Sequence, residues 1–114
     1  MGPPVDRTIL REQWRLLAVE WVEADNRASR AEEGRKIILD ELINSLIEAE
    51  PKLTQTAAER TARTSEAWKE YLRKMHEARR KANLARVVMK DKEMAWWELA
   101  SGEASQRAEM RMSR

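Results

Sequence analysis

The chain has 114 residues, of which 42% are hydrophobic and 37% charged, with three Gly, three Pro and no Cys. So few turn formers exclude a many-stranded β fold, and the length fits one domain. The lack of Cys excludes disulfides, thiolate nucleophiles and Cys-ligated metal clusters. Because strong helix formers such as Ala, Glu, Arg, Leu and Lys dominate, the sequence predicts an all-α protein.

Residues 1–6 contain two prolines and a glycine, and we expect a flexible N-terminus. Charged sequence follows at once, so we expect no signal peptide, no membrane span and a cytoplasmic protein. The two halves differ in charge. Residues 1–56 hold 8 Lys/Arg and 11 Asp/Glu, whereas residues 57–114 hold 14 and 9. This asymmetry indicates that the halves attract each other or that the second half attracts an anion.

Apolar residues spaced by three and four predict a first helix over about residues 7–50, which Pro51 ends. A Thr-rich connector over about residues 51–64 follows. The second helix begins either near Thr56, which has capping-box spacing to Glu59, or at Ser65, and runs to about residue 101. Ser101 and Gly102 are the expected break, and residues 102–114 are a polar tail.

Both predicted helices carry a stripe with small residues in its middle and large residues at its ends. Folding the chain back near residue 55 pairs residues whose numbers sum to about 111, which sets Ala against Ala and Trp14 beside Trp96. The sequence therefore predicts an antiparallel, coiled-coil-like hairpin of two long helices within residues 7–101. Its seam consists of Trp14, Leu17, Trp21, Ala24, Ala28, Ala31, Leu42, Trp68, Met75, Ala78, Ala82, Ala85, Met89 and Trp96.

Two helices cannot bury every apolar residue of this chain, so we expect a homo-oligomer that assembles into a larger bundle. The residues predicted to lie off the seam are Ile9, Leu16, Val22, Ile37, Ile43, Ile47, Leu84, Val88, Met94 and Trp97.

No pattern of a catalytic site occurs in the sequence. The single His76 cannot complete a zinc site or a catalytic triad, and Glu32-Glu33 are neighbours that do not share a helix face. There is no Gly-rich phosphate loop and no nucleophile elbow. We therefore predict no enzyme, no metal, no cofactor and no small-molecule substrate.

The second predicted helix carries a basic stretch between residues 73 and 92, with Trp and Tyr residues nearby. Such a face is typical of proteins that track a phosphate backbone. The hairpin register, however, sets Arg79 opposite Glu32, Arg86 opposite Asp25 and Lys90 between two acidic residues, Glu20 and Glu23. The candidate contacts for a nucleic acid or a protein partner are Arg73, Lys74, Arg79, Arg80, Lys81, Asn83, Arg86 and Lys90.

The second half also resembles a family of small, uncharacterised bacteriophage and prophage proteins. The matching segments are Ala58–Arg60, Ser65–Trp68, Met75–Arg86 and Trp97–Met110. The resemblance implies a phage setting, beside genes for recombination by single-strand annealing, and hence a host-cell cytoplasm.

Taken together, these patterns predict a non-enzymatic helical interaction or adaptor protein, accessory to phage DNA recombination or replication. Two alternatives stay open. The chain binds single-stranded nucleic acid directly through the basic face of the second helix, or it inhibits a host enzyme.

Overall fold

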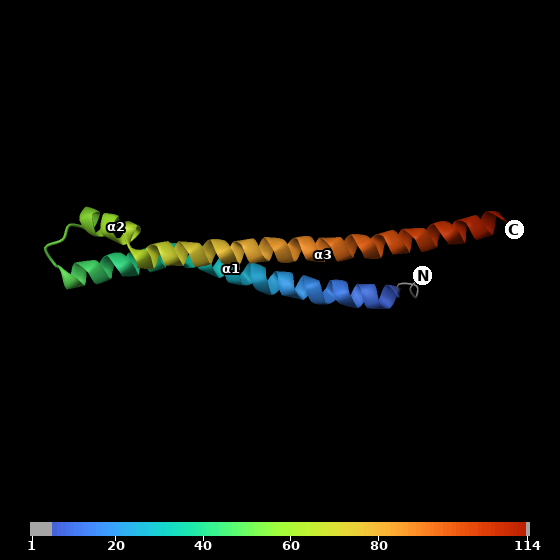
Figure 1. Ribbon diagram of the computed structural model, residues 1–114, viewed down its shortest axis with the longest axis horizontal. Helices are drawn as coiled ribbons and strands as arrows, with labels where there is room; N and C mark the ends of the chain where they lie inside the picture. The colour runs from blue at the N-terminus through green and yellow to red at the C-terminus, as the bar shows by residue number, and fades with distance from the viewer. Residues whose placement is uncertain (1–5, 114) are drawn as a thin grey trace. The chain divides into compact units, whose positions relative to one another are not determined.

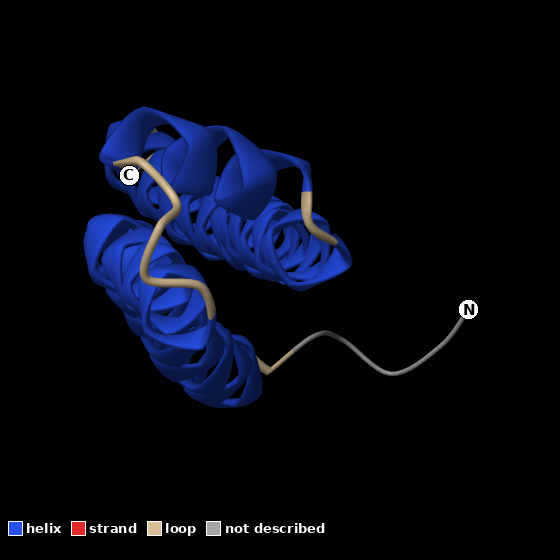
Figure 2. Cartoon of the chain, turned by 90° about the vertical axis from the view of Figure 1, so that its left-hand side faces the viewer, coloured by secondary structure: helices blue, strands red, loops and turns tan. Residues whose placement is uncertain are grey.

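The computed structural model describes residues 6–113, and every regular element in that range is a helix (Figures 1 and 2). Helix α1 spans Arg7–Ala49, α2 spans Gln55–Thr64 and α3 spans Glu66–Met112. The all-α prediction is confirmed. The predicted flexible N-terminus, apart from Asp6, lies outside the described residues. No helix in residues 6–113 is long and apolar enough to cross a membrane.

Helix α1 begins and ends where the sequence places its start and stop signals. The backbone N–H of Thr8 donates to Oδ1 of Asp6 at 2.8 Å, which satisfies a donor that the first turn leaves free. Pro51 follows two residues after the last helical residue, and it cannot continue the helix because it lacks an N–H. The predicted range of 7–50 is therefore correct to within one residue.

The predicted connector over residues 51–64 is wrong, because most of it is helix α2. Thr54, and not Thr56, is the N-cap, and its hydroxyl accepts a hydrogen bond from the N–H of Ala57 at 3.2 Å. Ala58 and Ala62, one turn apart, are fully buried. Their burial ties the segment to the core, and the packing of an apolar face stabilises so short a helix more than propensity does.

Ser65 separates α2 from α3 and caps both. Its hydroxyl donates to the carbonyl of Ala62 at 2.6 Å and accepts from the N–H of Trp68 at 3.2 Å. The backbone of Ser65 is extended, which breaks the run of helical dihedrals at one residue. The two alternative starts of the second helix are thus resolved as two successive helices.

The predicted break at Ser101 and Gly102 is also wrong, since α3 continues to Met112. One Gly in a helix costs only about 1 kcal/mol relative to Ala, and Glu and Ala residues that favour helix lie nearby. Glu103, just beyond Gly102, accepts from Arg7 of α1 at 2.8 Å. Residues 102–112 of the predicted polar tail are therefore part of helix α3.

The contacts divide the chain into two compact units. Unit 1 comprises residues 1–23 and 83–114, of which 6–23 and 83–113 are described, and unit 2 comprises residues 24–82. Each of the two long helices contributes to both units.

Unit 2 contains all of α2, together with parts of α1 and α3. Its larger core joins the three helices through residues that are at most 8% exposed. These are Leu39, Ile43, Ala58, Ala62 and Trp68. A smaller core of Ala24, Ala28 and Ala82, with Ala78 packed against it, lets α1 and α3 approach closely.

Two residues predicted to lie off the seam belong to the larger core of unit 2. Ile43 is 4% exposed, and Ile47 packs against the cluster. The hairpin prediction left these two side chains without a partner because it treated α2 as a connector. Once α2 lies beside the end of α1, as Figure 1 shows, that face of α1 is covered.

Unit 1 is a pair of helices with an aromatic contact between them. The ring centres of Trp14 and Trp96 are 5.7 Å apart, and Trp97 meets Trp96 edge-on at 4.8 Å. Leu10 and Met89 are buried at 8% and 4% exposure. Contacts that link low numbers of α1 to high numbers of α3 show that the helices run antiparallel within this unit.

Candidate interaction surfaces

Every predicted seam residue is buried or half-buried in the structure. Six of them are buried, namely Ala24, Ala28, Trp68, Met75, Ala82 and Met89. The remaining seam residues are half-buried, namely Trp14, Leu17, Trp21, Ala31, Leu42, Ala78, Ala85 and Trp96. Sequence reasoning missed Leu39, Ile43, Ala58 and Ala62. The available signal was the spacing of four residues between Leu39 and Ile43 and between Ala58 and Ala62.

Arg79 is the most heavily bonded side chain on the seam. Its Nε donates to Glu32 at 2.6 Å and its Nη1 to Asp25 at 2.6 Å, while Nη2 reaches Ser29 at 3.3 Å. The hydrogen bond that Arg79 donates to Glu32, followed by the one that it donates to Asp25, raises the pKa of the Arg79 guanidinium above its ordinary value. Arg79 is therefore committed to α1 inside unit 2 and is not free for a phosphate.

The predicted partner of Arg79 is observed, but the other two predicted ion pairs are absent from the described residues. Asp25 binds Arg79 and not Arg86, because the Arg79 fork bridges two carboxylates two turns apart on α1. Arg86 instead places its guanidinium carbon 5.8 Å from the centre of the Trp21 ring. Lys90 pairs with Glu93 on its own helix at 3.2 Å.

The other candidate contacts divide into paired and unpaired residues. Arg73 holds Glu70 through two nitrogens at 2.6 and 2.9 Å, which lowers the pKa of the Glu70 carboxyl. Lys74 lies 3.9 Å from the same carboxylate, and Arg80 lies 3.5 Å from Glu77. Lys81 and Asn83 are exposed, and Lys81 has no carboxylate within 4.0 Å among residues 6–113.

A groove of about 410 Å³ lies between α1 and α3 in unit 2 and gathers several of these cations. Ala24 and Ala78 form its floor, and four cationic side chains line it, with Glu77 as the single acid. The four cations are Arg27, Arg73, Lys74 and Lys81. Sequence reasoning missed Arg27, because it lies in the acidic half of the chain and no periodicity links it to the basic stretch.

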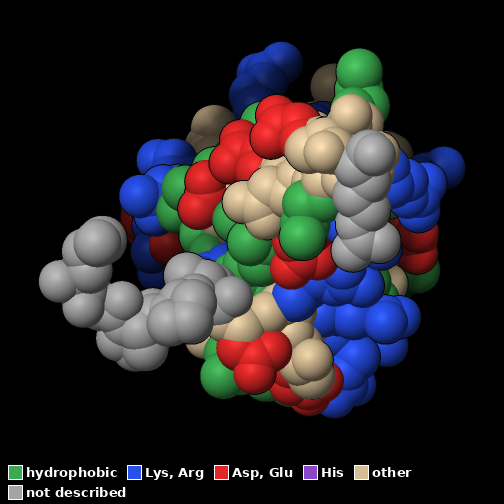
Figure 3. Space-filling view, turned by 90° about the vertical axis from the view of Figure 1, so that its right-hand side faces the viewer, with side chains coloured by type: hydrophobic (Ala, Val, Ile, Leu, Met, Phe, Trp, Pro, Cys, Tyr) green, Lys and Arg blue, Asp and Glu red, His purple; other side chains and the backbone are tan. Residues whose placement is uncertain are grey.

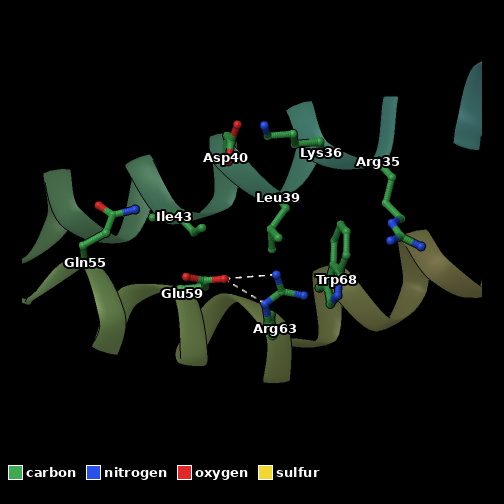
Figure 4. A pocket seen from close by; sticks show the side chains of 9 residues that line it. All are labelled: Arg35, Lys36, Leu39, Asp40, Ile43, Gln55, Glu59, Arg63 and Trp68. Atoms are coloured by element: carbon green, nitrogen blue, oxygen red, sulfur yellow. Dashed lines mark hydrogen bonds and ion pairs between the residues drawn. The ribbon is translucent and has the colours of Figure 1, made fainter. Parts of the chain in front are cut away.

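Figure 4 shows a second hollow of unit 2, of about 360 Å³, where α1 faces α2 and the start of α3. The Leu39 side chain points from α1 into the space between the helices, with Trp68 beside it, and Glu59 pairs with Arg63 at 3.0 Å. No His, Ser or Thr lines this hollow. In residues 6–113, no three side chains of His, Asp or Glu gather in a way that would hold a metal ion.

Unit 1 exposes large apolar side chains on both of its helices. The exposed residues are Ile9, Leu16, Val19 and Val22 on α1, and Leu84, Val87, Val88, Met94, Trp97, Met110 and Met112 on α3. On the face in Figure 3, hydrophobic side chains reach the surface between acidic and basic ones. In unit 2, the one such exposed residue among those described is Ile37.

His76 is exposed on α3 of unit 2, near one further hollow of about 350 Å³ that Glu32, Arg35 and Arg79 also line. Arg79 pairs with Glu32, which is the one acidic residue that lines this hollow. Comparison with models of protein families finds no match, and comparison with curated proteins and with solved structures finds no similar protein.

Proposed function

We propose that the chain is a non-enzymatic helical interaction protein that works as an assembly of copies of itself. The observation that carries this proposal is the apolar surface of unit 1. Val87 is 65% exposed, Met94 62% and Trp97 55%, all within about three turns of α3. Exposed apolar side chains that gather on one surface mark regions that other molecules cover, and Val87 and Met94 line one surface hollow together.

The charge of unit 1 favours a second copy as the covering molecule. The described helical segments of the unit, residues 7–23 and 83–112, carry eight Lys/Arg and eight Asp/Glu. A neutral surface with both signs interspersed attracts no strongly charged partner. Two copies related by a two-fold axis bring the same mixed surface together without net repulsion, and most soluble assemblies have such symmetry. The expected product is a larger helical bundle.

We also propose that α1 and α3 continue through both units as one antiparallel, coiled-coil-like hairpin. The contacts within each unit support this arrangement. In unit 1 Trp14 meets Trp96, and in unit 2 Arg79 meets Glu32, and both pairs have the register that the sequence predicts. The Ala-rich core of unit 2 allows the close helix approach that such a hairpin needs.

Sedimentation of purified protein over a hundredfold range of concentration tests the self-association. We expect a mass above that of one chain, and we expect Val87→Glu to lower it to one chain, because an ionised carboxylate cannot be covered by an apolar partner. Ile37→Glu is the matched control, since Ile37 is 61% exposed but lies in unit 2. A wild-type protein that stays monomeric throughout contradicts the proposal.

The biological setting that we propose is phage DNA recombination or replication in the host cell. The resemblance of residues 58–110 to phage and prophage proteins is its support. A phage recombination assay with and without the gene tests this setting. Loss of recombination when the gene is deleted would agree with this setting. If recombination is unchanged but a host enzyme becomes more active without the gene, the result would favour the inhibitor alternative.

A further inference from the structure

The cationic groove of unit 2 has a different character from the apolar surface of unit 1. Its lining cations come from two helices, because Arg27 lies on α1 and the other three lie on α3. Its floor is made of Ala24 and Ala78, which are too small to fill the space between the charged side chains. A negatively charged group can therefore approach several cations at once.

Ion pairing within unit 2 leaves part of this charge free. Arg27 and Lys81 have no carboxylate within 4.0 Å among the described residues. Lys74 shares Glu70 with Arg73 and lies 3.9 Å from it, and its side chain is 72% exposed. The acid of the groove, Glu77, lies 3.5 Å from Arg80 outside the groove. These contacts contrast with those of Arg79, whose three nitrogens all have partners.

The spacing of the groove cations favours an extended anion. Lys74 and Lys81 are seven residues apart on α3, so their backbone positions differ by about 10 Å along the helix. The two ammonium groups meet at one phosphate only if both side chains bend toward each other, whereas successive phosphates of a strand can contact each ammonium group without such bending. Trp68 is 5% exposed and so offers no ring for a base to stack on. The groove thus fits a backbone and not a base.

We propose that this groove binds the phosphodiester backbone of a nucleic-acid strand through Arg27, Lys74 and Lys81. Binding is independent of base sequence and strongly dependent on salt, because it consists of phosphate contacts and the release of counterions. The contribution of α1 through Arg27 distinguishes this site from a basic face on α3 alone.

Fluorescence anisotropy of a labelled oligothymidylate, titrated with the full-length protein at several salt concentrations, tests the proposal. We expect the double variant Arg27→Glu with Lys81→Glu to weaken binding by about tenfold or more and to reduce the salt slope by about 1.4, the value for two lost contacts. The control is Lys52→Glu with Arg60→Glu, which changes the net charge equally at exposed positions outside the groove. We expect the control to stay within about threefold of wild type.

Three results would overturn the proposal: no binding by the wild type at low salt, equal weakening by both double variants, or displacement of the oligonucleotide by inorganic phosphate at the same concentration of phosphate groups. Circular dichroism checks that each variant folds, and Arg27→Gln with Lys81→Gln is the milder pair if the charge reversal unfolds the protein. The anisotropy is measured also with Val87→Glu, so that a failure of self-association is separated from a failure of strand binding.

Discussion

Arg79 of α3 and Glu32 of α1 form a fork-like contact within unit 2, in which Nε donates to one carboxylate oxygen at 2.6 Å and Nη2 approaches the other at 3.3 Å. The same guanidinium reaches Asp25 with its third nitrogen. Because the contact lies beside the core of Ala24, Ala28 and Ala82, whose side chains are too short to interlock, we expect it to hold α1 and α3 in register within unit 2.

Replacing Arg79 tests this role in register. We expect Arg79→Met to lower the melting temperature by several degrees, because Asp25 and Glu32 lose a shared cation. Arg79→Lys should recover only part of the loss, since an ammonium group cannot reproduce the planar fork. Thermal unfolding followed by circular dichroism measures both. Arg80→Met is the control, because Arg80 meets only Glu77 at 3.5 Å, and an equal loss in this control would argue against a special role of Arg79.

Ala28 tests the close approach of the helices in unit 2. It is 0% exposed, so Ala28→Leu must push α1 and α3 apart or distort side chains, and we expect it to lower the free energy of unfolding by about 1–3 kcal/mol. Urea denaturation measures the change. Ala67→Leu, at an exposed position of α3, should leave the free energy of unfolding within about 0.5 kcal/mol of wild type. A stabilising Ala28→Leu would mean that the seam is not packed.

The start of α2 gives a comparison of two threonines. Thr54→Ala removes the hydroxyl that caps Ala57, and we expect a loss of about 1 kcal/mol in the free energy of unfolding. Thr56→Ala removes a hydroxyl that caps nothing inside the described residues, so we expect little change. Urea denaturation measures both variants. A larger loss in the free energy of unfolding for Thr56→Ala than for Thr54→Ala would show that Thr56 is the N-cap.

Glu70 provides a prediction about pH. The hydrogen bonds from Arg73 hold the pKa of the Glu70 carboxyl below its ordinary value. Desolvation opposes this lowering, and the positive charges of Arg73 and then Lys74 add to it. A carboxyl with a lowered folded-state pKa stabilises the folded state above its ordinary pKa, and this stabilisation is lost as the pH falls through the lowered pKa. Carboxyl NMR titration should show the Glu70 pKa rising toward its ordinary value in Arg73→Gln. An unchanged pKa would show that the ion pair does not form in solution.

Periodicity predicted the two long helices, the Ala-rich middle and the meeting of Trp14 with Trp96, because these depend on patterns within single helices and on one fold-back point. It did not predict α2, whose ten residues contain only three alanines to mark a buried face. The burial of Ile43 depends on that helix, so it was missed for the same reason.

The candidate site was predicted in part. The basic stretch on α3 was visible in the sequence, but its charges could not be divided into free and paired ones without coordinates. The Arg79 fork takes Asp25, which the register had assigned to Arg86, because one long side chain bridges the two turns of α1 that separate Glu32 from Asp25. Arg27 joins the groove across the interface between α1 and α3, and no sequence pattern marks such a neighbour.

The most direct test of the proposed assembly is a disulfide formed between two copies at Val87. Since the chain has no Cys, Val87→Cys introduces a single thiol on the apolar surface of unit 1. Under mild oxidation, we expect Val87→Cys to form a covalent dimer much faster than Ile37→Cys, which places an equally exposed thiol in unit 2. Equal rates of dimer formation for the two variants, measured by non-reducing gel electrophoresis, would contradict self-association through unit 1.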